Sequence, residues 1–548
     1  MAIAEPTLDP GAVVLPVVGR AERPRAPWGL AGTGALIGLL FCAPFAYLVV
    51  RNADDVSAAI DALASDEVLD PLLRTLWLAV TVTVACAVLG TAIAWLVTRT
   101  DLPARRVFAV AAVLPLVLPS FVAALAFVSA FARGGLLEEL FGIDTQVRVQ
   151  GFWAAFVVLT LISYPYVYLP VAARLAGLPR ALEESARSLG RSPAAVFRTV
   201  VLPQVRGSVL AGSLLVFLYV VSEFGAVALL HYDTLTRRIY SARLLDPTAA
   251  RAMSLTLGVV ALAVVVGERW VEARRRRIEA PSGTARPYQT PLRKWKAPAT
   301  AFVSLVVGIG LVVPVAVLAH WAWRGLSGTR NVLGTRADPE ALVEPTINTA
   351  LLGVVAALVA VVLVLPVAYL TARYRSRLGS AANAFVVAGF ALPGLVIALS
   401  LVTWTLQSPV LDRFYQTFPL LIFAYVVHFG AQAMRASQVA VNGVPRRLDD
   451  AARSLGAGRW RRLRTVDLPL MLPGLAAGAG LVLLSVMKEL PATLLLAPIG
   501  VETLATRIWS AAEEGFFAEA GIAALVLVAL SAVLTWFLTI RRLERLER

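Results

Sequence analysis

Residues 75–99 read TLWLAVTVTVACAVLGTAIAWLVTR, an apolar run interrupted only by small or hydroxylated side chains. A helix needs about 20 apolar residues to cross a hydrocarbon core of about 30 Å, so this run predicts a membrane-spanning helix. Residues 349–373, TALLGVVAALVAVVLVLPVAYLTAR, align with it without a gap, 274 positions further along the chain. The repeat predicts a chain built from two related, membrane-embedded halves.

The composition of the whole chain agrees with a membrane protein. Of the 548 residues, 58% are hydrophobic and only 16% are charged, whereas soluble domains average about 25% charged residues. The net charge of +15 would suit a nucleic-acid ligand if the bases formed one face of a soluble domain, but they lie between apolar runs. Cys42 and Cys86 both fall inside apolar runs and the three histidines are scattered, so neither a disulfide framework nor a metal cluster is predicted.

Twelve segments approach the length of a membrane span. Backbone groups in hydrocarbon must pair within the protein, and the runs lack the alternating pattern of a β-barrel, so the predicted fold class is all-α and polytopic. The predicted spans are 28–50, 76–97, 107–131, 152–173, 207–230, 253–270, 297–323, 347–370, 382–406, 418–434, 474–496 and 521–540.

The spans divide into two halves of six. Because six is even, both halves have the same orientation in the membrane, which makes them parallel repeats. With both termini inside the cell, most of the 50 Lys and Arg residues fall on the cytoplasmic side, as the positive-inside rule requires. The predicted parts are a cytoplasmic tail (1–27), a first half (28–272, with a core at about 70–270), a basic cytoplasmic linker (273–297) and a second half (298–548, with a core at about 345–540).

A second repeat lies in the polar loops between spans. Residues 183–203 read EESARSLGRSPAAVFRTVVLP, and residues 449–469, 266 positions further along, read DDAARSLGAGRWRRLRTVDLP. Gly190 and Gly456 suit the left-handed residue that ends a helix, and Ser192 suits the cap of a new one. Both loops are therefore predicted to form helix, turn and helix at the cytoplasmic surface.

These two loops resemble the EAA loop of ABC importer permeases. The first has Glu-Ser-Ala at 184–186, Gly190 three residues later, and Val-x-Leu-Pro ending at 203 after nine more; the second repeats this spacing from Asp450 to Pro469. The resemblance implies a type I ABC importer permease fold and a bacterial-type inner (plasma) membrane location. It also implies that residues 186–197 and 452–463 are coupling helices, which dock into a cytoplasmic ATPase subunit.

The same resemblance implies the partners. Two docking loops imply two copies of the ATPase, together with an extracytoplasmic substrate-binding protein and membrane lipid. No Gly-x-x-x-x-Gly-Lys-Ser/Thr phosphate loop is present, so ATP is expected to be used by the partner, and the chain is expected to be no enzyme and to hold no cofactor. Asp450 departs from the usual glutamate but keeps its charge. The residues expected to couple to the ATPase are Glu184, Ala186, Gly190, Pro193, Leu202, Pro203, Asp450, Ala452, Gly456, Arg459, Leu468 and Pro469.

Two further segments bear on the cargo. SEFGAVALLHYDTLTRRIY (222–240) and KELPATLLLAPIGVETLATRIWS (488–510) are similar to segments of iron(III) importer permeases. The resemblance implies ferric iron as the cargo. Permeases for thiamine, polyamines, sulfate and phosphonates share much of the same pattern and remain alternatives.

Glu223 and Glu489 occupy matching positions, 266 residues apart, inside predicted spans. Ionisable groups at such depth are costly and usually face a bundle interior or a wet pathway, so the pair is a candidate for the path of a cationic cargo. The alternative is that each carboxylate holds a neighbouring helix, for example Glu489 through Lys488. Tyr166 and its neighbours could also line a path, although tyrosines at the membrane interface are commoner.

Two other classes of protein remain open at this stage. An ion-coupled secondary carrier can also be built from parallel repeats, and its uptake would depend on a proton or sodium gradient. A membrane scaffold would show no cargo-dependent activity.

Overall fold

The computed structural model describes residues 26–53, 65–142, 147–274, 289–327, 338–374 and 376–546. Within these ranges the chain forms helices, and the sole β-pairing is an isolated bridge between Thr100 and Thr290. The all-α prediction is confirmed. Most of the predicted tail (1–27) and of the predicted linker (273–297) lies outside the described residues.

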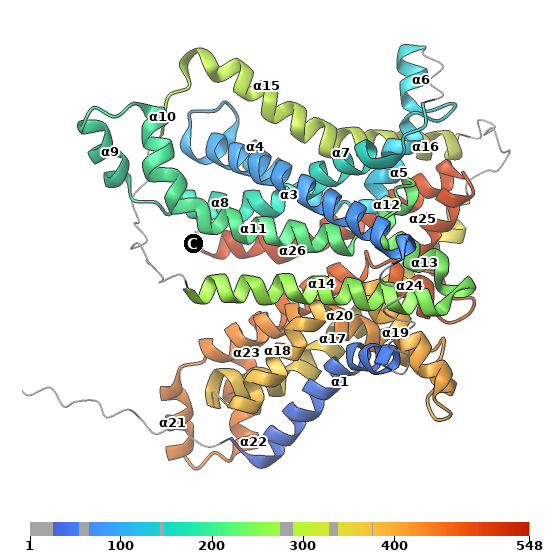
Figure 1. Ribbon diagram of the computed structural model, residues 1–548. Coiled ribbons are helices and arrows are strands. Elements are labelled where there is room, and N and C mark those ends of the chain that lie inside the picture. Colours follow the sequence, from blue (N-terminus) through green and yellow to red (C-terminus); the bar gives the residue numbers. More distant parts are fainter. Residues whose placement is uncertain are drawn as a thin grey trace, which may run out of the picture.

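The first half of the chain contains the elements up to α14 (Figure 1). They are α1 (Trp28–Ala53), α3 (Asp66–Arg99), α4 (Arg105–Ala111), η1 (Leu114–Val117), α5 (Ser120–Ala130), α6 (Leu136–Phe141), α7 (Gly151–Ser163), α8 (Pro165–Ala176), α9 (Arg180–Ser188), α10 (Pro193–Val196), η2 (Phe197–Val201), α11 (Leu202–Ser222), α12 (Gly225–Leu229), α13 (Leu235–Leu245) and α14 (Pro247–Arg274).

The second half repeats most of this order. Its elements are η3 (Arg293–Trp295), α15 (Lys296–Val307), η4 (Gly308–Val312), α16 (Val313–Leu326), η5 (Glu340–Leu342), α17 (Val343–Tyr369), η6 (Leu370–Tyr374), α18 (Arg377–Ala391), α19 (Gly394–Gln407), η7 (Asp412–Phe414), α20 (Phe418–Gly443), α21 (Arg446–Ser454), α22 (Arg459–Arg462), η8 (Leu463–Asp467), α23 (Leu468–Val486), α24 (Pro491–Leu496), α25 (Leu504–Glu513) and α26 (Phe517–Leu546).

Among the described residues, ten helical segments are long and apolar enough to cross a membrane, and two bent pairs raise the number to twelve. The bent pairs correct the sequence prediction, which treated 107–131 and 382–406 as continuous spans. The first pair bends by 94° before α5 and the second by 106° before α19. In both, the residue before Pro119 or Pro393 is extended, because the proline ring clashes with a helical predecessor.

Two further predicted spans are interrupted near their ends. The span at 207–230 stops at Ser222 and resumes as α12, and the span at 474–496 stops at Val486 and resumes as α24. Glu223 and Glu489 lie in these two interruptions. The sequence analysis predicted two continuous spans here, whereas the structure shows complete breaks.

The first span of each half packs against the other half. Helix α1 lies on α18, where a Cβ on Gly38 would stand 3.0 Å from the Cα of Ala382, so the two backbones are close. Helix α16 lies on α5 of the first half and on α26 of its own half, and the Trp321 indole donates a hydrogen bond of 3.1 Å to the Ser129 carbonyl of α5. Figure 1 shows this exchange, with α1 among the helices of the second half. The two halves therefore interlock.

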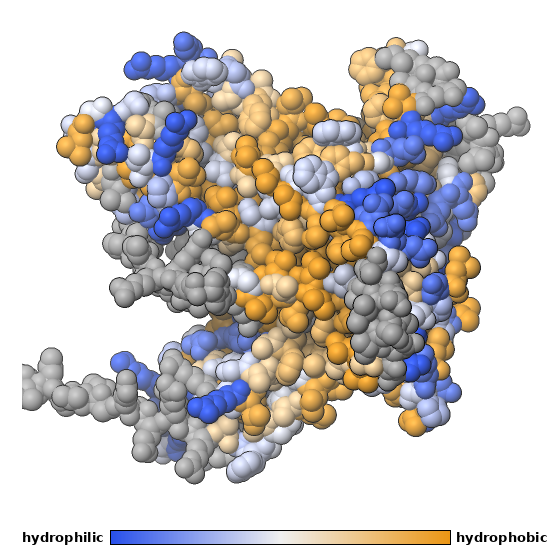
Figure 2. Space-filling view, in the orientation of Figure 1, coloured by the Kyte–Doolittle hydropathy of each residue, from blue (hydrophilic) through white to orange (hydrophobic). Residues whose placement is uncertain are grey.

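The two repeated loops lie at the same end of the molecule, called here the loop end. Figure 1 places α9 and α10 on one lobe of this end and α21 and α22 on the other. Figure 2 shows the two lobes standing apart there, while apolar residues cover the middle of the molecule. At the opposite end the halves are joined through the region of α12, α13, α24 and α25. The arrangement is open toward the loops and closed at the other end.

Candidate coupling loops and translocation path

Each repeated loop has the same hydrogen-bonded turn. Helix α9 is followed by a turn at Gly190, whose φ is +79°, and the N–H groups of Gly190 and Arg191 donate to the carbonyls of Arg187 and Ala186. Helix α21 is followed by the same turn at Gly456, with φ of +76° and the same two bonds 266 positions along the chain. This is the Schellman ending, which needs a left-handed residue and so favours glycine. The predicted helix ends are confirmed.

The second helix of each loop starts directly after the turn. The Ser192 hydroxyl accepts a hydrogen bond from the Ala195 N–H at 3.3 Å, as predicted for an N-cap, and the Gly458 carbonyl accepts one from the Arg462 N–H at 3.0 Å. Each short helix passes through a π-helical turn, η2 or η8, into a long span beginning at Leu202 or Leu468. Since proline needs no intrahelical donor in a first turn, Pro203 and Pro469 fit these starts.

The residues expected to couple to the ATPase lie around these turns. Glu184 and Asp450 are exposed, Ala186 is buried, and Ala452 is half-buried. Leu202, Pro203, Leu468 and Pro469 are exposed on the first turns of α11 and α23, and Gly190 and Gly456 are exposed at the bends. The side chains of Pro193 and Arg459 lie outside the described part of the structure.

Two apolar side chains occupy the loop tips at matching positions. Leu189 is 81% exposed and Leu455, 266 positions further along, is 88% exposed. A single exposed leucine is ordinary on a protein surface. The same exposure at both tips of a repeat favours a shared role in contacting a partner.

The structure also reveals a buried ion pair that sequence reasoning missed. The guanidinium of Arg99, at the end of α3, lies 3.1 Å from the Glu183 carboxylate at the start of the first loop, and both side chains are buried. Burial raises the pKa of Glu183, and the neighbouring guanidinium opposes that rise. Arg373, which aligns with Arg99, donates to the Val444 carbonyl at 2.9 Å. The sequence offered one hint that Arg99 has a role, because the aligned apolar runs 75–99 and 349–373 both end in arginine.

The first loop has an additional attachment. The Thr290 N–H donates to the Arg99 carbonyl at 2.8 Å, and the Thr290 hydroxyl accepts from Arg187 of α9 at 3.3 Å. Asp101 then accepts the Leu292 N–H at 2.7 Å and pairs with Lys296 at 2.8 Å. The segment 289–296, which leads into α15, is therefore fastened to the first loop.

This attachment predicts an acid-sensitive contact. The hydrogen bond from Lys296 and that from the Leu292 N–H lower the pKa of Asp101. A depressed folded-state pKa stabilises the attachment above the unfolded value of about 3.9, and this stabilisation is lost as the pH falls through the folded value. We expect the protection of the Leu292 amide, which is its intrinsic exchange rate divided by its measured rate, to fall below about pH 4.

Substitutions separate the two contacts of Asp101. Asp101→Asn keeps an oxygen for the Leu292 N–H but loses the ion pair, whereas Asp101→Ala loses both. Amide exchange at Leu292 should therefore rise more in the alanine variant than in the asparagine variant, with Asp66→Asn on the exposed start of α3 as the control. Wild-type exchange in Asp101→Ala would contradict the attachment.

Glu223 is buried at the break between α11 and α12. Its Oε1 accepts hydrogen bonds from the Ser120 hydroxyl at 2.8 Å and from the Ala226 N–H at 2.9 Å. The Tyr219 hydroxyl also lies near this carboxylate. The carboxylate therefore caps α12 and ties it to α5, one of the bent helices.

Glu489 occupies the matching break between α23 and α24. Its Oε1 accepts the Ala492 N–H at 3.0 Å, which is the same capping bond. Gly394 stands where the first half has Ser120, and a Cβ there would lie 2.7 Å from Oε1, so the glutamate fills the space that a serine side chain would occupy. Lys488 donates to the Leu116 carbonyl at 3.0 Å, across the interface between the halves.

The two breaks meet at this interface. The Leu490 side chain, next to Glu489, lies 3.3 Å from where a Cβ on Gly225 would stand, and that Cβ would also touch Phe121 at 2.8 Å. A glycine is needed here because α5 of its own half and Leu490 of the other half both lie so close to this backbone. Among the described residues, no group of three His, Cys, Asp or Glu side chains is placed to hold a metal ion.

A pocket of about 420 Å³ is lined by residues of α5, α12, α13, α25 and α26, next to the break that holds Glu223. Phe224 forms part of its wall and packs against Tyr240 and Trp509, with ring centroids 4.8 and 5.4 Å apart. Glu513 and Arg237 also line the pocket. The aromatic cluster therefore belongs to the closed end, next to the first glutamate.

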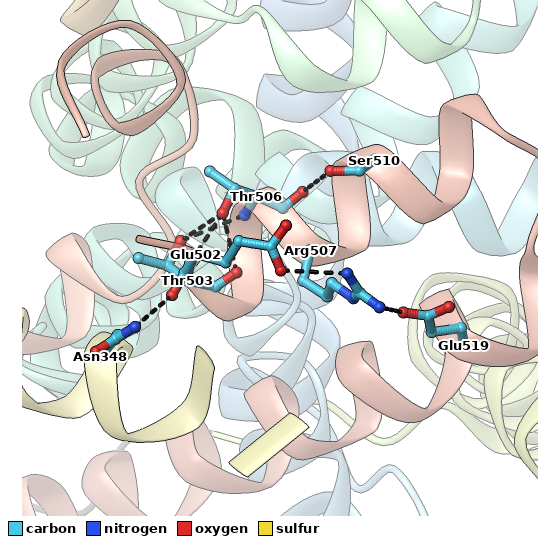
Figure 3. A network of polar contacts seen from close by, with 7 residues as sticks. All are labelled: Asn348, Glu502, Thr503, Thr506, Arg507, Ser510 and Glu519. Carbon is cyan, nitrogen blue, oxygen red and sulfur yellow. Dashed lines mark hydrogen bonds and ion pairs between the residues drawn. The ribbon is translucent and has the colours of Figure 1, made fainter. Parts of the chain in front are cut away.

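A polar network fixes α25 at this closed end (Figure 3). Thr503 caps the helix, and Arg507 bridges Glu502 and Glu519. The Thr349 hydroxyl of α17 accepts the Leu504 N–H at 2.8 Å, just as Thr75 of α3 accepts the Leu235 N–H at the start of α13. The network joins Asn348, Glu502, Thr503, Thr506, Arg507, Ser510 and Glu519.

Two interlocked, parallel halves with matched loops at one end define a polytopic transport protein of two repeats. The chain belongs to the family described as "Binding-protein-dependent transport system inner membrane component", which matches residues 74–279 and 364–543. It is a permease subunit, and the ATPase of such systems is a separate subunit. Family membership decides against the ion-coupled carrier and the passive scaffold.

Named relatives match over different lengths. The chain is 32% identical over 515 residues, covering 93% of this chain and 97% of the relative, to the "Fe(3+)-transport system permease protein FbpB 2" of Haemophilus influenzae. It is 37% identical over 195 residues, or 34% of this chain and 72% of the relative, to the "Molybdenum transport system permease protein ModB" of Mycobacterium tuberculosis. With the "Sulfate transport system permease protein CysT" of Salmonella typhimurium it shares 29% over 216 residues, or 39% of this chain and 78% of the relative.

Proposed function

We propose that this chain is the fused permease of an importer for ferric iron, which receives its cargo from an extracytoplasmic binding protein. The observation that carries the proposal is the likeness to an Fe(3+)-transport permease over nearly the full length of both chains. The molybdenum and sulfate relatives match about a third of the chain. Two buried carboxylates at the interface suit a cation better than an oxyanion, which supports the same choice.

The two loops are the docking sites for two copies of the ATPase. Their matched Schellman turns and the equally exposed Leu189 and Leu455 support two equivalent contacts. The loop end is then cytoplasmic, both termini are cytoplasmic, and the chain spans the inner membrane, with lipid around its apolar middle. ATP is used by the partner, and no cofactor is required in this chain.

The path runs between the halves. The lobes stand apart at the loop end, so the arrangement supports an inward-open state, and closure of the ATPase pair would bring the loops together. Glu223 and Glu489 then lie where the path meets the closed end. The segments 28–272 and 298–548 are the two functional halves, although α1 and α16 each pack on the opposite half.

The proposal is tested with the whole importer in proteoliposomes. The chain is purified with the ATPase that accompanies it, and ATP hydrolysis and uptake are measured with binding proteins loaded with ferric iron, thiamine, a polyamine, sulfate, a phosphonate or molybdate. Ferric cargo should stimulate both activities. Stimulation by another cargo but not by iron would overturn the substrate assignment and leave the permease assignment intact.

A further inference from the structure

The span that precedes Glu223 carries a second oxygen donor one helical turn closer to the loop end. Tyr219 lies four residues before Glu223 on α11, and its hydroxyl lies near the Glu223 carboxylate. Tyr166 of α8 packs against it, with ring centroids 5.6 Å apart. Both tyrosines are half-buried. Three oxygen-bearing side chains thus gather on one side of the interface.

The matching positions in the second half hold a different pair. Ser485 lies four residues before Glu489 on α23, and it exchanges hydrogen bonds of 3.0 Å with the amide of Gln432 on α20. These two positions are each 266 residues beyond Tyr219 and Tyr166. The pair is neutral, and its two side chains already satisfy one another.

The matching positions in the two halves also occupy equivalent places in space. A Cβ on Gly212 of α11 would lie 2.7 Å from the Cα of Val167, and a Cβ on Gly478 of α23 would lie 3.5 Å from the Cα of Ala433. The residues of the second contact are each 266 positions beyond those of the first. Helix α11 therefore packs on α8 in the same register as α23 packs on α20. The two halves therefore offer different chemistry at equivalent places.

The difference in chemistry favours one class of cargo. Hard cations bind oxygen ligands, and carboxylate and phenolate oxygens are anionic, whereas the amide and hydroxyl of the second half are neutral. A phenol releases its proton to a solvent or carboxylate acceptor when it binds the metal, and regains a proton when the metal leaves. An oxyanion such as sulfate would instead be repelled by Glu223 beside the two phenol oxygens.

We propose that Tyr166 and Tyr219, together with Glu223, are the cargo-selective contact for ferric iron, and that Gln432 and Ser485 serve only to pack the second half. The inference rests on the proposed function and assigns its selectivity to one half of the path. Three ligands from one side hold a metal less firmly than a closed site does. That suits conduction, which requires the cargo to leave as readily as it enters.

The chain supplies its own matched control for this inference. Tyr166→Phe/Tyr219→Phe removes two hydroxyls and keeps both rings, while Gln432→Leu/Ser485→Ala changes the equivalent pair. Both variants are assembled with the ATPase and the ferric-loaded binding protein in proteoliposomes, and iron uptake is measured. Separately, ferric nitrilotriacetate is added to the purified complexes, and the visible phenolate-to-iron charge-transfer absorption is recorded.

We expect the tyrosine variant to lose about tenfold or more of its iron uptake and to lack the absorption band. The control variant should keep both within about twofold. Wild-type uptake and an unchanged band in the tyrosine variant would overturn the inference while leaving iron transport by this chain in place. If the wild-type importer moves another cargo but no iron, the proposed function fails, and the inference fails with it.

Discussion

Replacing Glu223 and Glu489 together with glutamine is expected to reduce cargo uptake by roughly 100-fold or more. Truncating one partner of a buried charged contact costs about 2–5 kcal/mol, and both carboxylates are removed here. Glutamine retains a side-chain oxygen, so the capping bonds from Ala226 and Ala492 can persist. Uptake in proteoliposomes and the amount of folded complex recovered from the membrane are the two measurements.

This design separates the two roles that the sequence left open for these glutamates. If they only hold the starts of α12 and α24, the double glutamine variant will transport at the wild-type rate, and the path assignment is wrong. Glu67→Gln/Glu344→Gln is a suitable control, because these exposed acids lie in the matching first turns of α3 and α17. The single variants should differ, with the larger loss in Glu223→Gln because Ser120 and Tyr219 surround that carboxylate alone.

Replacing Gly190 and Gly456 together with valine is expected to reduce ATP-driven uptake to background while membrane insertion remains normal. A residue other than glycine pays about 1–2 kcal/mol in the left-handed conformation, and a β-branched residue fits it poorly. A Cβ at either position meets no atom within 4 Å, so the variant harms the backbone turn and not the packing. Each short helix would then leave its Schellman turn in a different direction.

The glycine prediction is checked by three measurements on the same preparation. Recovery of the chain from membranes reports insertion, co-purification of the ATPase reports docking, and cargo-stimulated hydrolysis reports coupling. Gly→Asn at both positions should retain most of the activity, because asparagine tolerates the left-handed region. Gly458→Ala, in the same loop but without a positive φ, should behave as wild type. Normal uptake in the double valine variant would remove the loops from the coupling mechanism.

The local structure of the loops was predictable because short-range rules govern it. A glycine that ends a helix and a serine that caps the next one act through neighbours within a few residues, and the structure places Gly190 and Ser192 in those roles. The positions of Glu223 and Glu489 in the repeat were equally visible. The Arg99–Glu183 pair was missed because the arginine that ends both aligned runs hints at a role for Arg99 but does not say that the end of α3 meets the start of α9.

The sequence by itself determined the all-α class, the two parallel repeats and the pairing of the loops. A chain in hydrocarbon must satisfy its own backbone hydrogen bonds, so long apolar runs form helices. Two segments with the same sequence pattern then form the same structure. Only the tertiary structure decided the exchange of α1 and α16, the bends before α5 and α19, and the meeting of the two breaks at Gly225 and Leu490. These features depend on close contacts between residues hundreds of positions apart, and such contacts leave no periodic signal in the chain.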